Sequence, residues 1–104
     1  MRAEIILGGR GTDEHVVPNR VVVQVGGSVV FRTADSRVHS VTFASSGMTA
    51  GVESFLSRTG QLRSPPLLER GTEYTVRFEG APPGFYPFVV EGPGPPVEGA
   101  VVVE

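Results

Sequence analysis

The chain has 104 residues, enough for one domain (residues 1–104) with a small hydrophobic core. Its formal net charge of −2 gives no electrostatic basis for binding nucleic acid or an acidic membrane surface. It contains no cysteine, so disulfides, thiolate chemistry and cysteine-ligated metals are excluded. Abundant valine, interrupted by 14 glycines and 9 prolines, predicts many short strands.

No segment reaches the length of a transmembrane helix, so we expect no membrane insertion. The apolar run at residues 5–7 is too short for the apolar region of a signal peptide. We expect a cytoplasmic location if Met1 is the native start, and a periplasmic or extracellular one if a leader has been removed.

The first half of the chain predicts three strands. Residues 1–7 form the first, and two valine-rich runs follow on either side of Gly26-Gly27, which we expect to make a hairpin turn. Apolar residues alternate along both runs, as in half-buried strands. Those expected to face inward are Val21, Val23, Val25, Val29 and Phe31.

The middle of the chain begins with a polar loop at residues 33–37, in which Asp35 is expected to belong to a turn. His39, Val41 and Phe43 then share one face at strand spacing. The polar stretch that follows carries a short helical turn near residues 52–57.

The last third predicts strands separated by proline and glycine. Tyr74, Val76 and Phe78 alternate with polar residues, and residues 80–84 then turn the chain. The next run contains Pro87, which favours an edge position or a bulge. The same run places Tyr86, Phe88 and Val90 on one face. A stiff loop at residues 92–96 then leads to a closing strand at residues 99–103.

This last third resembles the C-terminal signature of the cupredoxins, the plastocyanin-like blue copper proteins. Gly84, Tyr86, Phe88 and Gly99 match that signature. The first half also resembles the family, and His39 matches the position of the first copper ligand. The resemblance implies an all-β, Greek-key β-sandwich of about seven to eight strands.

The other copper ligands of the family are missing. Val90 stands at the Cys position, the second His would fall at or near Pro93, and the Met at or near Val97. A blue copper site needs two imidazoles and a thiolate with a weak axial ligand. We therefore predict a vestigial copper site at His39, Val90, Pro93 and Val97, and no copper cofactor.

Two interpretations of His39 remain open. It could bind Cu(II) or Zn(II) weakly, with Glu91 or with His15 and a carboxylate, which would make the chain a metal-binding or electron-transfer protein with a non-thiolate site. It could instead be buried at one end of the sandwich and hydrogen-bonded to a loop carbonyl, with His15 a solvated loop residue.

We expect no enzyme activity. No serine lies in the strand, elbow and helix pattern that exposes a nucleophile. Glu73, Glu79 and Glu91 fall on outer faces or loops, where solvated charge is usual rather than paired acid and base catalysis.

A binding or assembly role has more support, with a protein as the expected partner. In cupredoxins the loop between the Cys and Met ligands contributes to an apolar surface that docks redox partners. A stiff apolar loop loses little entropy on association, although the prolines could also merely stiffen a loop that metal once organised. A generic immunoglobulin-like sandwich, with His39 far from this loop, is a further alternative. The candidate docking residues are Pro93, Pro95, Pro96 and Val97.

Overall fold

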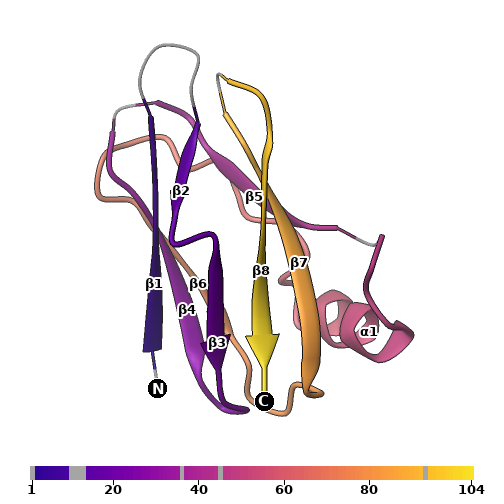
Figure 1. Cartoon of the computed structure of the whole chain (residues 1–104). Coiled ribbons are helices and arrows are strands. Elements are labelled where there is room, and N and C mark those ends of the chain that lie inside the picture. Colours follow the sequence, from indigo (N-terminus) through magenta and orange to yellow (C-terminus); the bar gives the residue numbers. More distant parts are fainter. Residues whose placement is uncertain (1, 10–13, 36, 45, 93) are drawn as a thin grey trace.

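The computed structural model describes residues 2–9, 14–35, 37–44, 46–92 and 94–104. Within these residues, eight strands form two four-stranded sheets that pack face to face (Figure 1). The predicted β-sandwich of about seven to eight strands is therefore confirmed.

The first sheet has the order β2-β1-β4-β6. Its central pair, β1 and β4, is parallel, and the two outer pairs are antiparallel. Ile5, Val29 and Phe31 point from this sheet into the core, as the alternation predicts for the last two. The strands are β1 (Arg2–Gly8), β2 (His15–Val17), β4 (Ser28–Thr33) and β6 (Glu73–Arg77).

The second sheet has the order β3-β8-β7-β5. Strand β3 runs parallel to β8, and the other pairs are antiparallel. Tyr86, Phe88 and Val90 are all buried, which confirms the predicted inner face of this run. The strands are β3 (Arg20–Val23), β5 (Ser40–Phe43), β7 (Gly84–Glu91) and β8 (Val97–Val103).

The hairpin predicted at Gly26-Gly27 is wrong, because β3 and β4 belong to different sheets. The glycines do form a turn, in which Gly27 N–H donates to Gln24 C=O at 2.9 Å and Gly26 has a φ of +92°. This turn carries the chain across the sandwich. Since β3 ends before it, Val25 is 45% exposed rather than buried.

The edge position predicted from Pro87 is also wrong, because β7 lies between β5 and β8. The Pro87 carbonyl accepts from Ala44 N–H at 2.9 Å, one residue beyond Phe43, where β5 ends. The proline nitrogen faces the same side as its carbonyl, so its missing N–H falls where the ladder stops. A central strand tolerates proline at such a point.

Helix α1 (Ala50–Arg58) extends the helical turn predicted near residues 52–57. Thr49 begins the helix by accepting a hydrogen bond from Val52 N–H at 3.3 Å. Phe55 packs edge to face on Tyr86 of β7, with ring centroids 6.4 Å apart. The helix thus completes the core beside one half of β7, away from the end of the sandwich at which β5 begins (Figure 1).

Candidate functional site at the end of the sandwich

His39 lies immediately before β5 and is completely buried. Its backbone forms an isolated antiparallel bridge with Leu67, with N···O distances of 3.1 and 2.8 Å. Val41 and Phe43 are also buried, so the predicted shared face of these three residues is confirmed.

Glu14 is the first hydrogen-bond partner of the His39 ring. It precedes β2, and its side chain is fully buried. One of its carboxylate oxygens, Oε1, is hydrogen-bonded to His39 Nδ1. The expected hydrogen bond from His39 to a loop carbonyl is therefore wrong, because the partner is a carboxylate. The burial of His39 is as expected.

Asp35 is the second partner, with Oδ1 located 2.8 Å from His39 Nε2. The same oxygen accepts from Arg37 N–H at 3.0 Å, which confirms Asp35 as a turn residue. The Arg37 guanidinium lies 3.4 Å from Glu14 Oε2 and 3.7 Å from Asp35 Oδ2. We call these four residues the buried ion cluster: Glu14, Asp35, Arg37 and His39.

The buried ion cluster places two carboxylates against an imidazole and a guanidinium. An ionised carboxylate can only accept hydrogen bonds, so the donors near it in this cluster are the His39 ring and Arg37. Burial alone would raise the pKa of the Asp35 carboxyl. The hydrogen bonds from His39 and the Arg37 backbone, with their positive charges, outweigh it and hold this pKa below its usual value.

The turn after β7 packs directly against the buried ion cluster. A Cβ atom placed on Gly92 would lie 2.8 Å from Glu14 Cδ, closer than such contacts occur. Only glycine fits at this position without a shift. The Glu14 carboxylate therefore lies between His39 and the loop that the resemblance associates with the other copper ligands.

The vestigial positions on β7 and β8 have become part of the core. Val90 stands at the Cys position, is completely buried and pairs with Val41 and Val97 on the neighbouring strands. Val97 is half-buried against the core. Pro95 and Pro96 are exposed, whereas Pro93 lies outside the described residues.

These residues do not fit a type 1 copper ion. The chain has no thiolate, and both nitrogens of His39 face carboxylates rather than an open coordination position. In the part of the chain that the structure describes, no group of three or more His, Cys, Asp or Glu residues is arranged to hold a metal ion. Neither Glu91 nor His15, the partners considered from the sequence, is among the hydrogen-bond partners of His39. His15 is exposed on β2, so its assignment to a loop is wrong.

An apolar surface lies beside the buried ion cluster. The bridge between His39 and Leu67 is antiparallel, so the flanking residues Val38 and Leu68 stand opposite each other. Their side chains are 50% and 58% exposed. The loop that carries the exposed Pro95 and Pro96 lies at the same end, because Glu91 pairs with Ser40, next to His39. We call Val38, Leu68, Pro95 and Pro96 the apolar end surface.

Sequence reasoning did not find Glu14. It follows another acidic residue, Asp13, in the sequence, and no spacing links it to His39, which lies 25 residues away. The one available signal was the need of a buried imidazole for two hydrogen-bond partners, of which Asp35 supplies only one.

This fold, with its altered ligand set, defines a cupredoxin that lacks the residues of a type 1 copper site. A sequence model of the copper binding proteins of the plastocyanin/azurin family matches residues 3–104, so the chain belongs to that family. No curated protein sequence matches it. No helix among the described residues is long and apolar enough to cross a membrane.

Solved structures agree on the fold. A purple cupredoxin from Nitrosopumilus maritimus is 23% identical, over 98% of this chain and 99% of that one, with a TM-score of 0.67. Oxidised plastocyanin from Dryopteris crassirhizoma is 19% identical, over 98% and 100%, with a TM-score of 0.74. Amicyanin from Paracoccus versutus is 17% identical, over 98% and 80%, with a TM-score of 0.67.

Proposed function

We propose that this protein is a copper-free cupredoxin that acts as a non-catalytic binding or assembly module. The observation that carries the proposal is the buried ion cluster: His39 is fully buried, and both of its ring nitrogens are held by carboxylates. A histidine held in this way has a structural role, because both of its ring nitrogens already have partners.

The buried ion cluster supports a binding role by connecting three segments. Glu14 belongs to the approach to β2, Asp35 and Arg37 to the loop after β4, and the Glu14 carboxylate packs on Gly92 after β7. The end of the sandwich is thereby fixed without a metal. A surface that is already ordered loses less entropy when it binds a partner.

We assign partner docking to the apolar end surface. Val38 and Leu68 are side by side and more exposed than most large apolar residues, and exposed apolar groups that cluster mark interaction sites. His39 itself cannot touch a partner because it is buried. Val97 packs against the core, so an aspartate there would test stability more than docking.

Variants Val38→Asp and Leu68→Asp test this assignment. Proteins captured by the immobilised chain would be identified by mass spectrometry, using purified protein shown by circular dichroism to be folded. We expect both variants to lose a set of partners that Val25→Asp retains. Val25 is a matched control, because it is 45% exposed and hydrogen-bonded to the C-terminal residue, at the opposite end of the sandwich. An identical partner set for all three variants would refute the assignment.

A further inference from the structure

The outer face of the second sheet carries a second surface, which does not depend on the proposed function. Side chains alternate along strands, so three neighbouring strands contribute every second residue to this face. The register places Ala100 of β8 between Arg20 and Pro87, Val102 between Val22 and Phe85, and Glu98 opposite Val89. We call this set the groove face: Arg20, Val22, Phe85, Pro87, Val89, Glu98, Ala100 and Val102.

A groove of about 470 Å³ lies in this face. Its lining includes Phe85, Pro87, Val89 and Ala100, so much of its surface is apolar. Phe85 is 44% exposed, and Val22 beside the groove is 47% exposed. Apolar groups of this size, gathered on one sheet face, favour contact with another protein surface.

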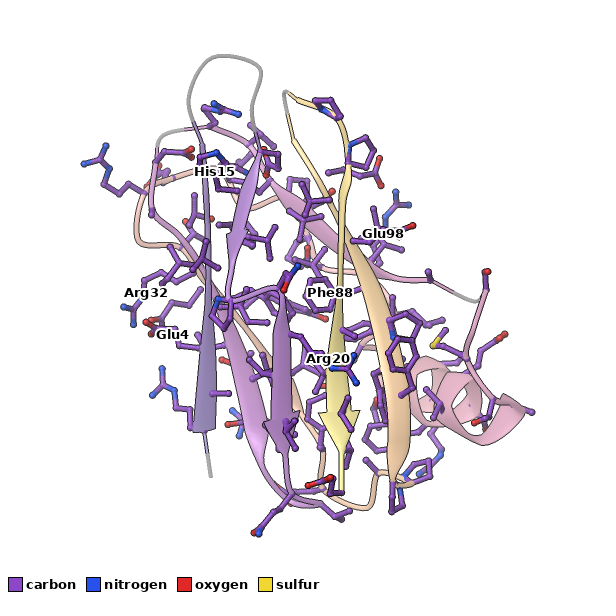
Figure 2. The ribbon with its side chains drawn as sticks, in the orientation of Figure 1. Glu4, His15, Arg20, Arg32, Phe88 and Glu98 are labelled. Carbon is purple, nitrogen blue, oxygen red and sulfur yellow. The ribbon has the colours of Figure 1, made fainter. Side chains whose placement is uncertain are left out.

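Two opposite charges, Arg20 and Glu98, also line the groove. Figure 2 shows both on the visible face, with Phe88 at a height between them. Both side chains are exposed, and neither forms an ion pair with any residue that the structure describes. The other sheet differs, since Arg32 on its surface contacts Glu4 at 2.9 Å and Glu73 at 2.6 Å.

We propose that the groove face binds a second copy of this chain in a symmetric dimer. A two-fold axis lying in the contact plane between Arg20 and Glu98 brings each arginine toward the glutamate of the other copy. Such an interface is isologous, and the same pair forms twice. A face with one unpaired cation, one unpaired anion and apolar residues is complementary in charge to the same face of a second copy.

The dimer should be weak and reversible. The groove face spans three strands spaced about 4.8 Å apart, with about 3.4 Å per residue along each strand. These spacings give the groove face an area smaller than the roughly 800 Å² per partner that is typical of stable complexes. The opposed charges then contribute mainly orientation and selectivity.

Charge reversal tests the proposal by sedimentation equilibrium of the full chain at low salt, from micromolar to millimolar concentration. The wild type should show a monomer to dimer equilibrium. Arg20→Glu and Glu98→Arg should each raise the dissociation constant about tenfold or more, because two attractive pairs become repulsive. Arg2→Glu and Glu79→Arg are controls with the same changes of net charge at exposed positions outside the groove face.

Mixing the two variants gives the decisive result. Arg20→Glu supplies two acidic groups and Glu98→Arg two basic groups, so an equimolar mixture should form the dimer that neither variant forms alone. A wild type that stays monomeric at millimolar concentration would overturn the proposal. Dimers that neither charge reversal affects would also overturn it, and so would a mixture of the two variants that fails to associate. Either result would assign the groove face to a different partner.

Discussion

The residue that most determines the character of this protein is Glu14. Its carboxylate is buried and shared between the imidazole of His39 and the guanidinium of Arg37. A buried carboxylate without such partners would be strongly disfavoured, so the contacts are mutually dependent. Where the family places a metal ion, this chain has two carboxylates held against an imidazole and a guanidinium.

Asp35 should make stability depend on pH. Its folded pKa is lower than usual, so the carboxylate stabilises the fold above the unfolded pKa of about 4. That contribution is lost as the pH falls through the folded pKa. At pH 7, Asp35→Asn should lower the free energy of unfolding by about 1.5–3 kcal/mol, the range for hydrogen bonds to charged groups. Urea denaturation of both proteins at pH 7 and near pH 2 measures the effect.

The difference between wild type and Asp35→Asn should shrink at the acid pH, because the unfolded chain binds a proton at this carboxylate below its pKa of about 4. Comparing the two proteins at each pH cancels titrations that they share. A difference of the same size at both pH values would show that the Asp35 carboxylate makes no charge-dependent contribution.

At the scale of elements, alternation in the sequence predicted the inner faces of β4, β5, β6 and β7. It failed where the outcome depends on distant chain segments. The turn at Gly26-Gly27 looks local, but its two strands pair with β8 and β1, which are remote in sequence. Pro87 is tolerated because β5 ends beside it, which no pattern around the proline reveals.

The turn between β7 and β8 yields a prediction about Gly92. Gly92→Ala should destabilise the protein by about 1–3 kcal/mol, as overpacking does, because the new Cβ meets the Glu14 carboxylate. Gly51→Ala is the control. This glycine is exposed in α1, and a Cβ there lies 4.0 Å from Pro82, so the helix should be stabilised by up to about 1 kcal/mol.

A double-mutant cycle with Glu14→Ala checks the cause. The cost of Gly92→Ala should largely vanish when the Glu14 side chain is absent, since the two groups are in contact. Equal costs in both backgrounds, measured by urea denaturation, would place the strain elsewhere.

At the scale of the whole molecule, the sandwich and the loss of the copper ligands could be predicted from sequence. The family pattern lies within local motifs around His39 and between Gly84 and Gly99, and a missing cysteine is visible by inspection. The replacement for the metal could not be predicted, because Glu14 and His39 meet only through the fold. The sequence predicted that the prolines of the apolar end surface take part in docking. It did not predict the part of Val38 and Leu68, which come together through the bridge at His39.

The most direct test of the account is an equilibrium Cu(II) titration followed by EPR, on wild type, His39→Gln and His15→Asn. Since the ring nitrogens of His39 are held by Glu14 and Asp35, the wild type should show no stoichiometric site that depends on His39. Any weak signal should disappear with His15→Asn, which removes the exposed imidazole. Tight binding at one Cu(II) per chain that is lost in His39→Gln would contradict the account and assign the protein to metal handling.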